Sequence, residues 1–339
     1  MQIDKLTSTA AFVITDLPGA DQAAGVVRAA NKVLQGSTQS LARSATYAFA
    51  SRELKVSGAS AGISAPADER EAAIASFVDE VSPQVEAGGL ALDAGTGVTP
   101  EALAPLAKLD RRDPVRSAEV DGLDLYSHLA ALGPVIAAEA ALGGLDGRRV
   151  ALEGSALTAR VVRELVARGA TVVAVSSPDG TAADPAGLPT ESLVESGADA
   201  VTSLAANLAP VDALMAVDAD ALLCGNRMGM IDGAVAEGVG ATVLVPTGPQ
   251  PVSAKGLAVL RRRGVVVHAD FITNSAPTWA GWPAGDSTVD AVIAAATAGI
   301  TDLVTGSDHA DGPLLGACYR AEAFLATWQD TLPFGRPLA

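Results

Sequence analysis

Lysine, aromatic residues and positive charge are all scarce in this chain of 339 residues. Aromatic residues make up only 4% of it, and five lysines occur: Lys5, Lys32, Lys55, Lys108 and Lys255. The formal net charge is −16, so the surface repels phosphate backbones and anionic lipid headgroups. We therefore expect no nucleic-acid partner and no membrane partner, and we expect a small molecule as the ligand.

Cysteine and histidine are too few and too scattered for a disulfide framework or a metal site. The chain has two cysteines and three histidines: Cys224, Cys318, His128, His268 and His309. The first residues lack the charged-then-apolar pattern of a secretory signal. Glu139 and Asp290 interrupt the longest apolar runs, so no segment reads as a membrane span. We predict a cytoplasmic protein with no metal.

Apolar residues, in contrast, are abundant. They make up 49% of the chain while charged residues make up 18%, which is ample for buried cores and excludes a disordered chain. The length suggests two domains of about 100–200 residues each. Because aromatic residues are rare, Ala, Val and Leu must supply most of the packing.

Segment patterns divide the chain into an uneven N-terminal part and a regular C-terminal part. In the first part we predict strands at residues 3, 12–14 and 90–92, helices at 21–34, 68–81 and from Pro100, and a loop at 57–59. A long apolar helix follows at 123–142. Continuous apolar runs then predict strands at 149–152, 170–175, 200–203, 221–223, 242–245 and 265–267, separated by helices. Such alternation predicts an α/β fold with a Rossmann-type doubly wound parallel sheet, and residues 287–329 again read as helical.

The turn after the first of these strands is the candidate phosphate site of a nucleotide. A dinucleotide turn normally uses three glycines, whereas the four residues here are Gly154, Ser155, Ala156 and Leu157. The Ala156 methyl weakens a close phosphate approach without excluding it, and the helix N-terminus still offers N–H groups. The next strand ends in Ser176 and Ser177, where an acidic residue would mark NAD, so we predict NAD or NADP as the cofactor.

Four places in the sequence, the first of which has two parts, resemble the glutamate/leucine/phenylalanine/valine dehydrogenase family. Residues 45–48 and 57–60 (Ala-Thr-Tyr-Ala and Ser-Gly-Ala-Ser) are similar to the family's Met-Thr-Tyr-Lys and Gly-Gly-Gly-Lys. Residues 93–96 (Asp-Ala-Gly-Thr) are similar to Asp-Val-Gly-Thr. Residues 149–176 follow the family's strand–turn–helix–strand, and residues 270–277 (Asp-Phe-Ile-Thr-Asn-Ser-Ala-Pro) are similar to Asp-Ile-Leu-Ala-Asn-Ala-Gly-Gly.

The resemblance, to a divergent member of that family, implies a domain organisation and a reaction. It implies an N-terminal α/β substrate and oligomerisation domain (1–130), a nucleotide-binding domain (131–300) and a C-terminal helical segment (301–339) that packs back on the first domain. It also implies homo-oligomers and NAD(P)-dependent oxidative deamination. The implied cofactor-binding residues are Gly154, Ser155, Ala156, Leu157, Ser176, Ser177, Gly225 and Asn274. Asp93 takes the place of the family's proton-shuttling aspartate.

Departures from the family pattern fall on the residues that carry the chemistry. Ala48 stands where the family has the lysine that grips the substrate α-carboxylate. Ser60 stands where it has the lysine that activates water, and a hydroxyl cannot replace an ammonium. Asp121 replaces a threonine that faces the nicotinamide, and Pro249 replaces a cofactor-contacting asparagine. We place Ala48, Ser60, Asp121 and Asn274 in the substrate cleft, where these changes argue against oxidative deamination.

Three interpretations stay open. The first is an oxidoreductase acting on an amino or oxo acid or an imine, because a reductase does not need to activate water. The second is a catalytically inactive homologue, a pseudoenzyme that binds a nucleotide or a partner protein. The third is an unrelated doubly wound domain, because fold analogy does not fix function. An Asp followed by Ala-Gly-Thr-Gly is also an ordinary turn or cap, so Asp93 fits each of them.

Overall fold

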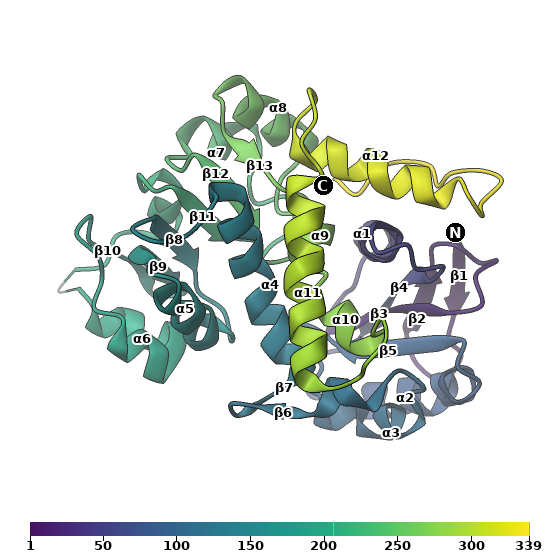
Figure 1. The fold of residues 1–339 in the computed structure, drawn as a ribbon. Helices are drawn as coiled ribbons and strands as arrows, with labels where there is room; N and C mark the ends of the chain where they lie inside the picture. The colour runs from purple at the N-terminus through teal and green to yellow at the C-terminus, as the bar shows by residue number, and fades with distance from the viewer. Residues whose placement is uncertain (206, 339) are drawn as a thin grey trace. The chain divides into compact units, whose positions relative to one another are not determined.

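The computed structural model describes residues 1–205 and 207–338, which form two compact units. Unit 1 comprises Met1–Pro114 and Arg320–Pro337, and unit 2 comprises Val115–Tyr319 and Leu338. Figure 1 labels their helices and strands. Each unit has its own sheet and its own core.

Unit 1 is built on a mixed sheet of five strands in the order β1-β2-β4-β3-β5. The strands are β1 (Gln2–Lys5), β2 (Ala11–Thr15), β3 (Ala23–Ala30), β4 (Ser57–Ser64) and β5 (Leu90–Ala94). β4, β3 and β5 are parallel, whereas β2 runs antiparallel to both of its neighbours. The carboxyl ends of β4, β3 and β5 therefore lie at one edge of the sheet.

Helices cover the two faces of this sheet. One face carries the main core of the unit, where Val27, Ala61 and Leu92 pack against α2 (Arg70–Glu86) and α3 (Ala104–Leu109). The opposite face carries α1 (Gln35–Ser51), which packs on β4. The helix comes so close that a Cβ at Gly58 would lie 1.9 Å from the Ala42 carbonyl oxygen. Only glycine fits there.

Two sequence predictions for unit 1 were wrong. Residues 21–34 were expected to be helical because they are rich in alanine, but they contain β3, whose pairing with β4 and β5 overrides that preference. Residues 57–59 were expected to be a loop but begin β4, where small residues allow α1 to approach. The strands at residues 3, 12–14 and 90–92 and the helix at 68–81 are confirmed.

Unit 2 contains a six-stranded sheet in the order β10-β9-β8-β11-β12-β13. The strands are β8 (Arg149–Glu153), β9 (Thr171–Ser177), β10 (Gly180–Ala183), β11 (Ala221–Cys224), β12 (Val243–Pro246) and β13 (Val266–Val267). All are parallel except β10, which forms a hairpin with β9. The predicted α/β class with a Rossmann-type parallel sheet is confirmed. The strand order reverses beside β8, which is where such sheets bind ligands.

The main errors in unit 2 lie after β9. The expected strand at 200–203 is part of a 3₁₀ segment, Gly197–Ser203, and β10 was not expected at all. Residues 200–203 (Ala-Val-Thr-Ser) form a stretch too short for its pattern to distinguish a strand from a tight helix. The helix expected at 123–142 is α4 (Leu125–Leu142), and α11 (Val289–Thr305) and α12 (Pro313–Leu325) confirm the helical C-terminal region.

Helix α4 is the central helix of unit 2 and runs beside α11 (Figure 1). By length and composition alone it could cross a membrane, but 61% of it is buried inside the protein. A Cβ at Gly133 would lie 2.7 Å from the Thr273 carbonyl oxygen, so glycine lets α4 pack closely against α9 (Asp270–Thr273). This packing is that of a core helix.

Short elements complete the two units. They are β6 (Glu119–Val120), β7 (Leu123–Asp124), α5 (Thr158–Ala167), α6 (Glu191–Ser196), α7 (Gly233–Gly238), α8 (Ala254–Arg262), α10 (Pro277–Gly281) and the 3₁₀ turns Glu101–Leu103, Pro114–Ser117 and Val211–Ala216.

Candidate functional site

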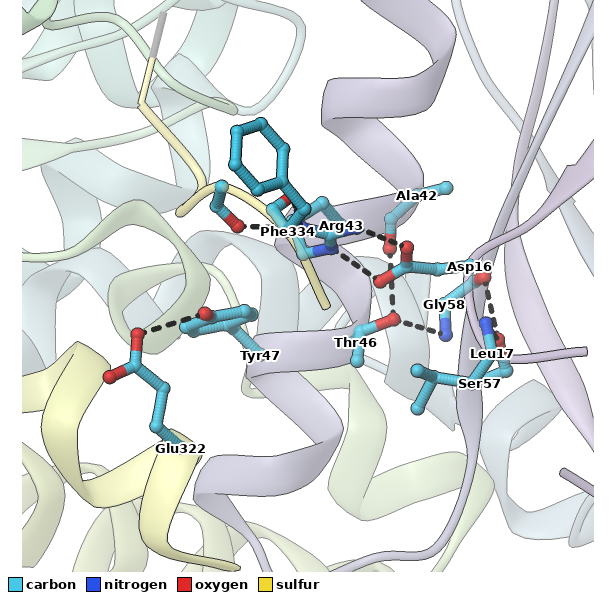
Figure 2. Close-up of polar contacts among 11 residues, drawn as sticks. Asp16, Leu17, Ala42, Arg43, Thr46, Tyr47, Ser57, Gly58, Glu322 and Phe334 are labelled. Atoms are coloured by element: carbon cyan, nitrogen blue, oxygen red, sulfur yellow. Dashed lines mark hydrogen bonds and ion pairs between the residues drawn. The ribbon is translucent and has the colours of Figure 1, made fainter. Parts of the chain in front are cut away.

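In unit 1, polar contacts fix helix α1 against the sheet and against the C-terminal segment (Figure 2). Arg43 donates two hydrogen bonds to the buried Asp16 carboxylate, at 2.7 and 2.8 Å. Its remaining nitrogen donates to the carbonyl oxygens of Phe334 and Gly335. A paired, bidentate arginine of this kind sets both the position and the rotation of the helix.

Two further contacts lie along the same helix in Figure 2. Thr46 Oγ1 accepts a hydrogen bond from the Gly58 N–H at 2.9 Å, and Tyr47 donates from its hydroxyl to Glu322 at 3.0 Å. Ala48 follows directly on this fixed turn and is 8% exposed. Helix α1 is therefore held in place. Where the family that the sequence resembles has a lysine, however, this chain has only the methyl group of Ala48.

Ser60 and Asp93 lie in one row across the sheet of unit 1. Val26 on β3 is paired with Ser60 on β4 and with Asp93 on β5, so the two polar side chains are on the same face, which is also the face that α1 covers. Ser60 is 1% exposed, and its hydroxyl accepts a hydrogen bond from Arg28 at 3.2 Å. The structure thus brings these two predicted residues onto one surface.

Asp93 is held in a buried ion cluster. Arg112 contacts both of its carboxylate oxygens, at 2.7 and 2.8 Å, and also contacts Asp110 at 2.6 Å. The side chains of Arg112, Asp93 and Asp110 are 6%, 14% and 8% exposed. Burial by itself lowers the pKa of Arg112, but the charges and hydrogen bonds of the two carboxylates raise it beyond its ordinary value.

This cluster limits what Asp93 can do. Both oxygens of the Asp93 carboxylate accept hydrogen bonds from the Arg112 guanidinium. A proton-transfer role would therefore require one of these hydrogen bonds to break. The role of Asp93 as a proton shuttle stays a prediction.

In unit 2, side chains of the predicted phosphate turn accept hydrogen bonds from N–H groups of the same turn. The Ser155 N–H donates to Thr158 Oγ1 at 2.7 Å, and the Leu157 N–H donates to Ser155 Oγ at 3.2 Å. Among the described residues, the N–H groups of Ala156, Ala159 and Arg160 have no acceptor, and they lie at the start of α5. These three amides fit one anionic group, although fewer amides remain than in a full glycine-rich turn.

The surviving glycine has a packing role. A Cβ at Gly154 would lie 2.3 Å from the Ser176 carbonyl oxygen, and the Gly154 N–H donates to that same oxygen. Ser177 is 7% exposed, and its hydroxyl accepts from the Asp179 N–H in the β9–β10 turn. Neither serine carries a charge that favours NAD over NADP.

The loop after β11 is bound by a residue that was not predicted. Glu153, at the end of β8, accepts hydrogen bonds from the Gly225 and Asn226 N–H groups at 2.7 and 2.9 Å. Gly225 also lies against the next loop, because a Cβ there would be 2.5 Å from the Gly248 nitrogen. The predicted cofactor contact at Gly225 thus supplies no unused N–H group.

Asp121 and Asn274, both expected in the substrate cleft, also have partners within unit 2. Asp121 pairs with Arg160 at 2.9 Å, and this hydrogen bond and charge lower the pKa of Asp121. The Asn274 side-chain amide donates to the Asp270 carbonyl oxygen at 3.0 Å and caps α9. The Asn274 side-chain oxygen therefore remains its main group for a ligand.

Sequence reasoning missed the three arginines that define these contacts. Arg28 was placed in a helix, and Arg112 and Arg160 lie 19 and 39 residues from their partners Asp93 and Asp121. Residues 23–30 (Ala-Ala-Gly-Val-Val-Arg-Ala-Ala) have no alternation of small and larger residues, so no local pattern places Arg28 on a strand.

Comparison with known proteins gives the same fold. Residues 122–276 match the sequence model of the Glutamate/Leucine/Phenylalanine/Valine dehydrogenase family. Hetero-hexameric glutamate dehydrogenase from Thermus thermophilus is similar with a TM-score of 0.75 and 20% identity, over 94% of this chain and 84% of that chain. L-tryptophan dehydrogenase from Nostoc punctiforme gives 0.64 and 15%, over 98% and 97%. Plasmodium falciparum glutamate dehydrogenase gives 0.71 and 10%, over 94% and 79%. No curated protein sequence matches the chain.

Proposed function

We propose that this protein is an NAD(P)-dependent oxidoreductase that reduces a preformed carbon–nitrogen double bond in a small molecule. Residues 122–276 belong to the Glutamate/Leucine/Phenylalanine/Valine dehydrogenase family, as a divergent member. The chain has the fold of amino-acid dehydrogenases. The resemblance seen in the sequence is confirmed by these matches. The reaction, the substrate and the roles of individual residues belong to the proposal.

The observation that carries the proposal is the charge distribution on the α1 face of the sheet in unit 1. Ala48 and Ser60 provide no ammonium group, so nothing at these positions activates water to form or hydrolyse an imine. Asp93 remains there, and its carboxylate is held in place by the Arg112 guanidinium. A fixed carboxylate stabilises a cationic iminium nitrogen, and that is the charge present while a carbon–nitrogen double bond is reduced.

Unit 2 supplies the nucleotide site in this proposal. In it, the unused N–H groups of Ala156, Ala159 and Arg160 would bind one phosphate, and Ser177, the last residue of β9, would face the ribose. A dihydronicotinamide nucleotide bound there would supply the hydride. We further propose the domain roles implied by the resemblance, a homo-oligomer and a cytoplasmic location. Light scattering on the purified protein would test the oligomeric state.

A spectrophotometric assay tests the activity. NADH or NADPH oxidation should be seen with cyclic imines that need no water activation, and should be weak with oxo acids plus ammonia. Oxidative deamination of amino acids should be absent. Background rates with every imine and both nucleotides would contradict the proposal.

The hydrogen bonds within the phosphate turn favour a second candidate function, that of a nucleotide-binding or interaction protein without catalysis. Ser155 and Thr158 satisfy two N–H groups that a glycine-rich turn would offer to pyrophosphate. Thermal shift titrations with NAD, NADP and ADP distinguish the cases, because a ligand that binds the native state raises stability with the logarithm of its concentration. Stabilisation without turnover on any imine would favour the pseudoenzyme, and any turnover would exclude it.

A further inference from the structure

The β6–β7 hairpin of unit 2 is fixed by one buried arginine. The hairpin turns at Asp121 and Gly122, whose φ angles of 48° and 82° are both positive, as in the type I′ turn that Asp-Gly favours. Its ladder has only two residue pairs, and a hairpin of that size is marginally stable by itself. Arg160 on α5 donates to the Asp121 carboxylate and to the Asp121 carbonyl oxygen, both at 2.9 Å. This pair of contacts holds the turn on α5.

His128, in the first turn of α4, lies close to Arg160. Both the hairpin and α5 pack against α4, and His128 is only 6% exposed. Its Nδ1 is buried and has no hydrogen-bond partner among the described residues. A protonated imidazole donates from both ring nitrogens, so the charged form would leave a buried N–H without an acceptor.

The charges around His128 also act on its protonation. Burial is the largest cause that lowers the pKa of His128 below 6.5, and repulsion from Arg160 and Arg168 on α5 adds to it. Glu164 on α5 and Asp121 in the hairpin act in the opposite direction. Both carboxylates already have a partner, because Asp121 pairs with Arg160 at 2.9 Å and Glu164 pairs with Arg168 at 2.7 Å. The arrangement therefore favours a neutral His128.

We propose that the contact between Arg160 and Asp121 is a pH-sensitive latch, which holds the β6–β7 hairpin on α5 while His128 is neutral and releases it when His128 is protonated. A positive charge on His128 repels the Arg160 guanidinium and attracts the Asp121 carboxylate, so it weakens the latch at both partners. The hairpin follows closely after Pro114, where the chain leaves unit 1. Release therefore frees the first part of unit 2, and it requires neither a nucleotide nor the proposed reaction.

Opening of the hairpin takes up a proton, which sets the direction of the pH effect. In the open state His128 is hydrated and has its ordinary pKa near 6.5, whereas in the closed state its pKa is lower. The hairpin is therefore held above pH 6.5. Its opening equilibrium constant rises as the pH falls below that value, by up to about tenfold per pH unit.

Hydrogen–deuterium exchange of the full-length protein, followed by mass spectrometry, tests the latch at pH 7.5 and pH 5.5. Peptides that contain residues 118–127 report on the hairpin, and peptides that contain β11 report on opening of the core. The protection factor of the hairpin, corrected for the intrinsic exchange rate at each pH, should fall by up to about tenfold at the lower pH, and that of β11 should fall less. His128→Gln should keep the hairpin protected at both pH values. Arg160→Met should leave it poorly protected at both.

His309→Gln is the matched control, because it removes an imidazole of the same unit whose side chain is 43% exposed and lies between α11 and α12. It should keep the full pH dependence of the hairpin. An equal protection factor at both pH values in the unmodified protein, the same fall in His128→Gln, or a fall in β11 as large as in the hairpin would overturn the proposal. Full protection of the hairpin in Arg160→Met at pH 7.5 would also overturn it, because another contact would then hold the turn.

Discussion

Replacing Arg112 with methionine should destabilise the protein strongly at neutral pH. The change removes the guanidinium that pairs with both Asp93 and Asp110, whose side chains are 14% and 8% exposed. Both carboxylates lie within hydrogen-bond distance of one guanidinium, so they are about 5 Å apart. Two unit charges at that separation repel by about 3 kcal/mol at an effective dielectric constant of about 20. Breaking a buried ion pair by deleting one partner typically costs about 3–5 kcal/mol, which agrees with this value.

Urea unfolding of Arg112→Met and of the unmodified protein at pH 7.5 provides the measurement. Adding Asp110→Asn to Arg112→Met should restore most of the lost stability at pH 7.5, because one negative charge then remains.

Arg111→Met is the matched control, since Arg111 is exposed and donates to the Glu86 carbonyl oxygen rather than to a carboxylate. It should change the unfolding free energy by less than about 1 kcal/mol, as expected for a surface substitution. The reasoning fails if Arg112→Met is as stable as this control, or if adding Asp110→Asn restores none of the lost stability.

Three further predictions concern single side chains. Asp93→Asn should lower kcat for imine reduction by about 100-fold or more, the typical effect of losing one electrostatic group, and an unchanged kcat in steady-state assays would remove Asp93 from the site. Burial lowers the pKa of His268 from 6.5 to about 4. The protein should therefore lose stability as the pH falls from 6.5 to 4, because only the unfolded chain takes up a proton on this histidine in that range. His268→Leu should abolish this pH dependence of the unfolding free energy, which is up to about 3 kcal/mol, in urea unfolding. Hydrogen bonds from Ser8 and Thr7 lower the pKa of Glu80 to about 2, so its contribution to stability is present above pH 4.5 and lost toward pH 2. Thermal melts of Glu80→Gln should therefore differ from the unmodified protein at pH 6 and approach it at pH 2.

The Rossmann-type sheet of unit 2 could be predicted because buried parallel strands appear as continuous apolar runs, as in residues 149–152 and 170–175. β3 could not, because its alanines favour a helix locally and only pairing with β4 and β5 makes the segment a strand. The error at β3 also concealed Arg28. The register that sets Ser60 and Asp93 on one face is a tertiary property that no local pattern encodes.

The polar partners were harder to predict than the strands. Pairing of Asp93 with Arg112 depends on the path of the chain between β5 and the segment after α3, and pairing of Asp121 with Arg160 depends on how β6 and β7 meet α5. Sequence comparison could therefore mark which charges were missing at 48 and 60. It could not show which other charge lies beside Ser60.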